Sequence, residues 1–379
     1  MNNKFKDLCL LSFAVIFITF IIWLPHFLAL PDFWGLNFSQ GFSTIYRNYD
    51  GLEYVTIAKT FYQPELIAKI PQSLSASYYA AHFPGYSILI LALSPILGFL
   101  KSMLFISLLF TLLSVWAFYF LIRDFKLSSQ PLYLSLLFLI LPARWVIVHS
   151  IGSAEPIFIF FIITSIYFFM KFEQSKKFSD ILVTAIFGIL AQITRPPGIL
   201  LFLALTLYIL YRRKSFFNLL KYFPLLLLPL SLIGIFYLFN LTYGDFWAYF
   251  HSGDNIHLTF PPFQIFNKHQ FWVGEIWLED IIYIFILGFL GGLLLLKQRL
   301  YPMAFFVLVY LGASTLIAHR DIARYTLPVF PFLLIAFEKV LISREFKIVL
   351  IIISLAIYLY TQNFLIENVA PIPNIGLFN

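Results

Sequence analysis

Long hydrophobic runs separated by short polar stretches dominate the sequence. The first run extends from Cys9 to Leu30, and many of the later runs approach the ~17 to 25 residues that a helix needs to cross a bilayer. A membrane β-barrel would instead show short segments of alternating polarity, and only helices and closed barrels satisfy every backbone group in lipid. The pattern therefore predicts an all-α integral membrane protein.

We expect about eleven transmembrane helices from the spacing of these runs. After the first run, the expected spans lie near residues 104–122, 132–148, 157–170, 181–194, 199–211, 223–241, 281–296, 303–318, 325–341 and 348–361. The stretch Gly85–Phe99 is also apolar, but prolines and glycines interrupt or flank it. We expect an interfacial or re-entrant helix there, and not a complete span.

Composition agrees with a membrane protein. Hydrophobic residues make up 61% of the 379 positions and charged residues only 11%, whereas soluble domains carry ~25% charged residues. Most of the 25 basic residues fall in alternate loops, which predicts a cytoplasmic N-terminus. We expect the protein to lie in the cell membrane. The net charge of +7 is therefore an orientation signal, and no nucleic-acid partner is expected.

The first run follows Lys4 and Lys6 and could be mistaken for a signal peptide. It is too long for the apolar core of one and lacks a small-residue cleavage site, so we interpret it as a retained anchor. We expect one polytopic domain over residues 1–379 with two long outer loops, 31–103 and 242–280. Both loops are rich in aromatic residues, and long outer loops of compact membrane proteins are more often functional than idle.

The most informative loop segment begins at Tyr49-Asp50-Gly51. Apolar residues recur at helical spacing after it, which predicts a short amphipathic helix lying at the membrane interface. Asp50 stands at the start of this helix and Glu53 three residues later, so spacing alone favours a capping box. The functional alternative is that Asp50 serves as a general base toward an acceptor hydroxyl.

Polar residues also gather at the predicted outer ends of the spans, where ionisable groups are default candidates for a site. Each has a structural explanation when taken alone: Arg144 and Arg195 could snorkel to headgroups, Glu155 could cap a helix, and Arg320 could pair with Asp321 at the surface. Together, several arginines facing one leaflet suit a phosphate group. The seven histidines are scattered without ligand spacing, so no metal is expected.

An ordered set of short polar and aromatic segments runs along the chain. It consists of Tyr49-Asp50-Gly51 with Tyr54, Ile57-Ala58 and Phe61-Tyr62, then His82-Phe83-Pro84-Gly85-Tyr86, Ser153-Ala154-Glu155-Pro156, Thr194-Arg195-Pro196, the stretch from Gly244 to His251, Arg324-Tyr325 and Phe330-Pro331. In order and loop placement this set resembles the GT-C superfamily of polytopic glycosyltransferases, most closely the PIG-V-type mannosyltransferases and their bacterial relatives. It departs from that pattern at Tyr49, where Trp is usual, and at Pro197, where a small or polar residue is usual.

The resemblance implies an inverting transfer of a hexose, with mannose as the first guess, from a polyprenyl-phosphate sugar. The acceptor would be a glycan, lipid or protein outside the cytoplasm, and neither a nucleotide sugar nor a cofactor or metal would be needed. It implies Asp50 as the base, with Glu53 and Glu155 as further catalytic candidates. The donor-phosphate candidates are Arg195, Arg320, Arg324 and His82, and the acceptor or sugar contacts are Tyr49, Tyr54, Asp245 and His251.

Three other functions stay open. A transporter or lipid flippase would also be polytopic, but such proteins often show internal repeats and charges along a path, and the sequence shows neither. A polysaccharide ligase or polymerase would use arginines on lipid-linked sugars without needing Asp50. An accessory relative without activity is the third possibility.

Overall fold

The structure, a computed structural model, describes residues 3–70, 74–212, 219–253, 258–267, 269, 278–372 and 375–378. Within these residues, six helices are long and apolar enough to cross a membrane. They are Lys4–Phe27, Phe99–Asp124, Glu155–Ser175, Leu220–Tyr243, Glu279–Lys297 and Arg344–Glu367. The prediction of an all-α membrane architecture is therefore confirmed.

The remaining predicted spans are occupied by shorter or broken helices. The range 132–148 was expected to be one helical span, but it consists of two helices, α7 (Pro131–Ile140) and α8 (Ala143–His149), bent by 77°. Pro142 lies at this break, where its missing N–H cannot continue the helical hydrogen bonds. The range 325–341 is likewise divided, with Pro328 and Pro331 at its internal junctions.

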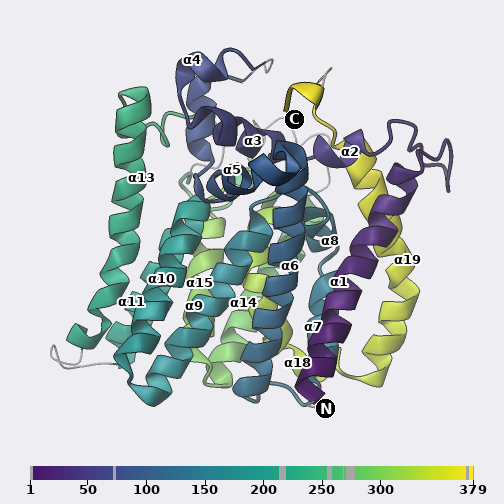
Figure 1. Ribbon diagram of the computed structural model, residues 1–379. Helices are drawn as coiled ribbons and strands as arrows, with labels where there is room; N and C mark the ends of the chain where they lie inside the picture. Colours follow the sequence, from purple (N-terminus) through teal and green to yellow (C-terminus); the bar gives the residue numbers. More distant parts are fainter. Residues whose placement is uncertain are drawn as a thin grey trace. The chain divides into compact units, whose positions relative to one another are not determined.

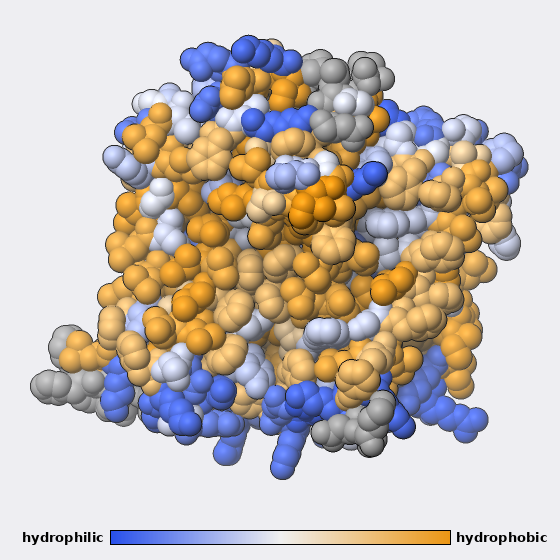
Figure 2. All heavy atoms as spheres, in the orientation of Figure 1, coloured by the Kyte–Doolittle hydropathy of each residue, from blue (hydrophilic) through white to orange (hydrophobic). Residues whose placement is uncertain are grey.

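The described helices form two compact units, one of residues 1–160 and 338–379 and the other of residues 161–337. Each unit is described by itself, and the expectation of one continuous domain stays a prediction. In both units, hydrophobic side chains cover the sides of the helices and hydrophilic ones gather near the helix ends (Figure 2), the distribution that a bilayer requires.

The first unit contains α1, α19 and the described part of residues 31–103, which were predicted to form the first outer loop (Figure 1). Its elements are α1 (Asn3–Phe27), α2 (Ser43–Tyr46), α3 (Gly51–Thr60), α4 (Pro64–Ile67), η1 (Ala76–Ala81), α5 (Gly85–Leu97), α6 (Phe99–Asp124), α7, α8, the start of α9 (Glu155–Ser175), α18 (Glu338–Leu341), α19 (Arg344–Glu367) and η7 (Ile375–Phe378). His26 of α1 and Gln362 of α19 are hydrogen-bonded at 2.9 Å. This buried polar contact joins the first and last long helices.

Helix α5 has 13 residues and is therefore about 20 Å long, less than the ~30 Å of a hydrocarbon core. It ends at Gly98, whose φ of +75° turns the chain directly into α6. Helix α5 packs against both α3 and α6. The length and the sharp turn agree with the expectation of an incomplete span at Gly85–Phe99.

The second unit is built from paired apolar helices. Its elements are the rest of α9, α10 (Phe178–Thr194), η2 (Pro196–Gly198), α11 (Ile199–Arg212), η3 (Leu220–Leu226), α13 (Leu227–Tyr243), η4 (Gln264–Phe266), α14 (Glu279–Lys297), α15 (Tyr301–Ser314), α16 (Ile322–Tyr325), η6 (Leu327–Val329) and α17 (Phe330–Ala336). Gly288 and Gly292 of α14 face leucines of α15 so closely that an added Cβ would lie 2.6 Å from them. Small residues at such positions allow membrane helices to approach closely.

Candidate functional site

Asp50 lies at the N-terminal end of α3, in the first unit. Its side chain makes no capping hydrogen bond to this helix, so the interpretation of Asp50 and Glu53 as a capping box is wrong. The Asp50 side chain is 30% exposed, and its Oδ2 lies 3.9 Å from Nε2 of His82. The carboxylate is thus turned toward a side chain from a different segment, where it is partly open to a reactant.

Helix α3 differs from the expected amphipathic surface helix. Eight of its ten residues are buried, including Leu52, Val55 and Ile57 at 0% exposure. The helix also ends at Thr60, and Phe61 follows in the left-handed conformation with φ of +47°. A helix surrounded on nearly all sides is held rigidly by packing, so it fixes the position of Asp50 better than a half-exposed helix would.

His82 follows the short helix η1 and is 8% exposed. Its ring meets the ring of Tyr54 edge to face at 5.2 Å and lies 5.4 Å from that of Tyr78. The hydroxyl of Tyr62 donates to the His82 carbonyl at 2.6 Å. These contacts orient the imidazole toward Asp50, so His82 lies beside the candidate base, whereas its expected role at the donor phosphate stays a prediction.

The Asp50 segment also packs directly on the segment that precedes Glu155. A Cβ added at Gly51 would lie 3.0 Å from the carbonyl oxygen of Gly152 and 2.9 Å from Sδ of Met103. Only glycine permits so close an approach of the two backbones. The segment Tyr49-Asp50-Gly51 and the residues leading into Ser153-Ala154-Glu155-Pro156 are therefore neighbours in space.

Glu155 itself is fully buried at the start of α9. Ser153 donates a hydrogen bond from Oγ to its carboxylate, and the backbone N–H of Ser153 donates to Oγ of Ser107 at 3.1 Å. The hydroxyl of Tyr86, whose ring lies 5.1 Å from that of Tyr54, is 2.8 Å from the same Ser107 oxygen. A buried polar network thus leads from Glu155 to the aromatic side chains around His82.

Glu53 lies in the first turn of α3, near Tyr79. Burial raises the pKa of the Tyr79 hydroxyl well above its ordinary value, and the negative charge of Glu53 raises it further. The phenol therefore stays protonated, and it is a hydrogen-bonding group and not an acid. A catalytic role of Glu53 stays a prediction.

Tyr49 and Arg144 form a contact that the sequence did not indicate. Snorkelling was one explanation offered for Arg144. In the structure its Nη1 donates to the hydroxyl of Tyr49 at 2.8 Å, and its guanidinium lies 4.2 Å from the ring centre of Phe364. The two residues are 95 positions apart. The sequence marked Arg144 only as an arginine at a predicted span end and gave no sign of its contact with Tyr49. Arg144 therefore belongs to the Asp50 region of the first unit.

In the second unit, Arg195 ends α10 and is 8% exposed. Burial raises the pKa of Tyr249 to about 12, and the positive charge of Arg195 opposes that shift. The chain turns tightly after α10, because a Cβ at Gly198 would lie only 2.5 Å from the Gln192 backbone.

Arg324 of α16 is 4% exposed, and its Nη1 lies 3.8 Å from Oδ2 of Asp321. Asp321 lies against Arg324 because one helical turn brings residues three apart onto one face. Arg320 is exposed, and a surface pair between Arg320 and Asp321 stays a prediction. Of these two arginines, Arg324 is the one held in a buried, charge-balanced position.

Asp245 and His251 lie in the loop that follows α13 and are hydrogen-bonded to each other. Their Oδ2 and Nδ1 atoms are 2.6 Å apart, and Asp245 Oδ1 accepts from the backbone N–H of Trp247 at 2.9 Å. The hydrogen bond with His251 lowers the pKa of the Asp245 carboxyl, and that with Trp247 lowers it further. Both side chains are solvent-exposed, and their expected contacts with the sugar or acceptor stay predictions.

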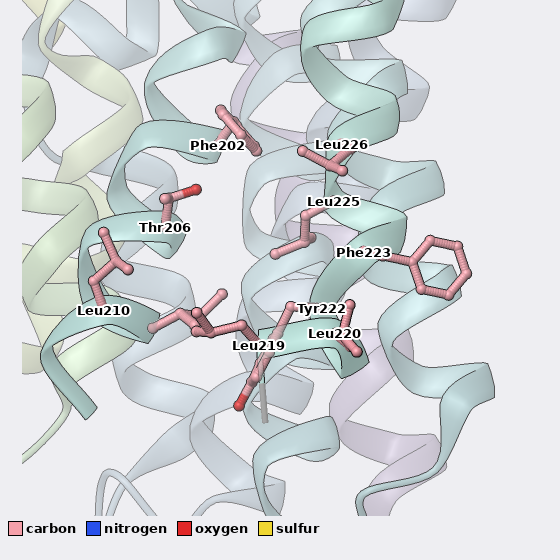
Figure 3. A pocket seen from close by; sticks show the side chains of 10 residues that line it. Phe202, Thr206, Leu210, Leu219, Leu220, Tyr222, Phe223, Leu225 and Leu226 are labelled. Atoms are coloured by element: carbon pink, nitrogen blue, oxygen red, sulfur yellow. The ribbon is translucent and has the colours of Figure 1, made fainter. Parts of the chain in front are cut away.

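An apolar cavity of about 250 Å³ lies between α11 and η3 of the second unit (Figure 3). Leucine and phenylalanine side chains form most of its wall, with Thr206 and Tyr222 as polar members. The Tyr222 hydroxyl donates to Glu173 at 2.5 Å. The cavity therefore suits hydrocarbon and offers no base or acid for group transfer.

Within the described residues, no group of three His, Cys, Asp or Glu side chains converges as a metal site would require. The use or absence of a metal therefore stays a prediction. The described contacts bring together Asp50, His82, Tyr54, Glu155, Tyr49 and Arg144 in the first unit, and Arg195, Arg324, Asp245 and His251 lie in the second.

No family model and no curated protein matches this sequence. In structure, the chain is similar to the oligosaccharyltransferase of Archaeoglobus fulgidus tethered to an acceptor peptide with an NVT sequon, with a TM-score of 0.52 and 14% identity. It is also similar to AglB of the same organism in complex with an inhibitory peptide and a dolichol-phosphate, with a TM-score of 0.50 and 14% identity.

The first of these likenesses covers 98% of this chain and 56% of the archaeal chain, so the protein spans little more than half the length of its structural neighbour. At 14% identity the likeness shows the fold. The chain thus has an all-α membrane fold of the GT-C type, as the ordered motifs predicted, and its multi-pass membrane character is supported by the same likeness.

Proposed function

We propose that this protein is a glycosyltransferase that moves a hexose from a polyprenyl-phosphate sugar to an acceptor outside the cytoplasm. The observation that carries the proposal is the Asp50 carboxylate, which makes no capping hydrogen bond to α3 and lies 3.9 Å from His82 Nε2. The buried helix α3 holds it there in a fold of the GT-C type. The neighbours with this fold are oligosaccharyltransferases, and one was observed with a dolichol-phosphate. That supports a lipid-linked donor.

The proposed reaction inverts the anomeric centre in one displacement. The acceptor hydroxyl gives its proton to the Asp50 carboxylate while its oxygen bonds to the anomeric carbon. The bond from that carbon to the phosphate oxygen breaks, and the electron pair leaves with the polyprenyl phosphate. A base at the acceptor and cations at the phosphate are both needed, because charge changes at both ends of the displacement.

The chain's own residues suit these roles to different degrees. Asp50 is partly exposed and can accept a proton, whereas Glu155 is fully buried with Ser153 bonded to it and is better suited to holding the loop backbone. Arg324 and Arg195 are buried arginines suited to phosphate, because a guanidinium donates two parallel hydrogen bonds. Arg320 is the exposed third candidate.

Several finer points also belong to the proposal. A cytoplasmic N-terminus and an outward-facing Asp50 follow from the distribution of basic residues, and the cell membrane is the proposed location. Mannose as the sugar follows from the resemblance to the PIG-V type. Glycan, lipid and protein acceptors are all compatible with the proposal. Peptides were observed on the archaeal neighbours, so a peptide is one of the acceptors to add to the transfer assay.

The test is transfer of radiolabelled sugar from polyprenyl-phosphate donors in membranes that contain the wild type or the Asp50→Asn variant. Asp32→Asn is the matched control, because Asp32 is an exposed carboxylate in the same loop. We expect Asp50→Asn to lose at least about a hundredfold in rate, the range of general-base catalysis, at unchanged protein level, while Asp32→Asn retains transfer. Equal transfer by all three proteins contradicts Asp50 as the base.

The flippase alternative has its own readout. Liposomes that contain the purified protein and a fluorescent polyprenyl-phosphate lipid would show protein-dependent translocation if the protein were a flippase. Wild-type protein that translocates lipid but transfers no sugar from any donor would overturn the proposed function. Transfer that survives Asp50→Asn but is lost with Arg195→Gln or Arg324→Gln would favour the ligase or polymerase alternative.

A further inference from the structure

Tyr49, the residue before Asp50, has an unusual backbone conformation. Its φ is +48°, in the left-handed region that side-chain-bearing residues seldom adopt. Such a conformation persists only where the surrounding contacts hold it, and it often occurs next to functional groups. The next residue is the candidate base. The contacts that hold the Tyr49 backbone therefore also set the direction in which the Asp50 side chain points.

Two contacts hold the Tyr49 side chain. Its ring stacks on that of Phe364 of α19, with the centroids 5.4 Å apart and the planes 29° from parallel. Its hydroxyl accepts from Nη1 of Arg144 in α8 at 2.8 Å. The Arg144 guanidinium in turn lies 4.2 Å from the ring centre of the same Phe364, a cation–π distance. Tyr49, Arg144 and Phe364 therefore form a closed three-way contact, here called the Tyr49 clamp.

The backbone around Tyr49 is attached to α19 as well. The Asn48 side chain donates to the carbonyl of Leu365 at 2.9 Å, and the N–H of Ala370 donates to the carbonyl of Arg47 at 2.9 Å. These bonds fix the residues before Tyr49, and α3 fixes those after Asp50. Arg144 comes from a third element, α8, and it contacts Tyr49, the residue with the left-handed backbone.

We propose that Arg144 is a positioning residue for the transfer reaction, acting through the Tyr49 hydroxyl to hold Asp50 in place. This inference rests on the proposed function. The Arg144 guanidinium contacts both the Tyr49 oxygen and the Phe364 ring, and a charged donor makes a stronger hydrogen bond than a neutral one. The bond therefore resists relaxation of Tyr49 to a negative φ, which would turn the Asp50 carboxylate away from its place beside His82.

The kinetic test is a double-mutant cycle with Tyr49→Phe, Arg144→Gln and the combined variant. Tyr49→Phe removes only the hydroxyl and keeps the ring on Phe364. A 1 Å misplacement of a catalytic group can cost about a hundredfold, so we expect each single variant to lower kcat by about tenfold to a hundredfold, with KM for the donor nearly unchanged. The double variant should be no worse than the more impaired single variant, because both changes break the same contact.

Two further variants separate positioning from other roles. Arg144→Lys keeps a charged donor but not the planar fork, and it should recover part of the lost kcat. Arg123→Gln is the matched control, because Arg123 also lies over aromatic rings, at 5.4 Å from Tyr119 and 5.1 Å from Phe120, at the far end of α6. It should transfer sugar as the wild type does. Losses that multiply in the double variant, or a loss confined to donor KM in Arg144→Gln, overturn the inference.

Hydrogen exchange tests the clamp without any activity. The Tyr54 N–H donates to the Asp50 carbonyl at 3.2 Å in the first turn of α3, so loosening Tyr49 should speed exchange there in both Tyr49→Phe and Arg144→Gln. Exchange in α6 should stay unchanged. Unaltered exchange at the start of α3 overturns the inference, whereas faster exchange in a protein that transfers no sugar keeps the clamp and contradicts the proposed function.

Discussion

The contact between Gly51 and Gly152 offers a sharp test of how the Asp50 region is built. In Gly51→Ala the new methyl group would lie 3.0 Å from the Gly152 carbonyl oxygen and 2.9 Å from Met103 Sδ. The methionine side chain can move, but the carbonyl belongs to the backbone of the segment leading into Glu155. Since comfortable contacts lie near ~3.5 Å or beyond, the two segments must separate by about half an ångström.

We expect this separation to cost stability and activity together. Overpacking of a filled interior costs about 1 to 3 kcal/mol, and displacement of Asp50 by about half an ångström should slow transfer by about tenfold. In Gly152→Ala the three nearest atoms all belong to the Met103 side chain. Its effect should therefore shrink in a Met103→Ala background, whereas Gly51→Ala should keep most of its effect there, because the carbonyl of Gly152 remains.

The assay is sugar transfer together with the thermal unfolding midpoint of the detergent-purified protein. Gly234→Ala is the control, because Gly234 lies in α13 with no atom within 4 Å of an added Cβ. It should leave transfer unchanged and stabilise slightly, as Gly→Ala does in helices, by about 0.5 to 1 kcal/mol. If Gly51→Ala matches Gly234→Ala in both measurements, the close backbone approach does not position Asp50.

Two further predictions follow from the described contacts. His82→Asn should keep the fold but lower kcat by about tenfold, because the Asp50 carboxylate loses the imidazole 3.9 Å away and general-base groups depend on such orientation. An unchanged kcat, in a variant with the thermal unfolding midpoint of the wild type, would show that His82 does not act on Asp50. In the Asp245 loop, the pKa of Asp245 is lowered by the hydrogen bond from His251, so the contribution of this contact is present above the ordinary carboxyl pKa and is lost as pH falls through the lowered one. Trp247 fluorescence should report that opening in acid, and His251→Gln should move its midpoint to higher pH; an unmoved midpoint would contradict the assignment.

Much of the architecture was available from the sequence, because the length of an apolar run is a local property that the bilayer reads directly. The long helices and the incomplete span at Gly85–Phe99 both follow from nearby residues. The breaks in 132–148 and 325–341 were missed because hydropathy alone does not show whether proline ends a helix or is accommodated within it.

The candidate site shows the opposite balance. The sequence by itself marked Asp50 as important, but spacing favoured a cap, and only the tertiary structure turns its carboxylate toward His82, 32 positions away, instead of toward the backbone of α3. The approach of Gly51 to Gly152 and the bond between Tyr49 and Arg144 join residues about a hundred positions apart. Local propensity determines which segments become helices, whereas the packing of side chains from distant segments decides which polar groups meet, because those contacts exist only once the helices are assembled.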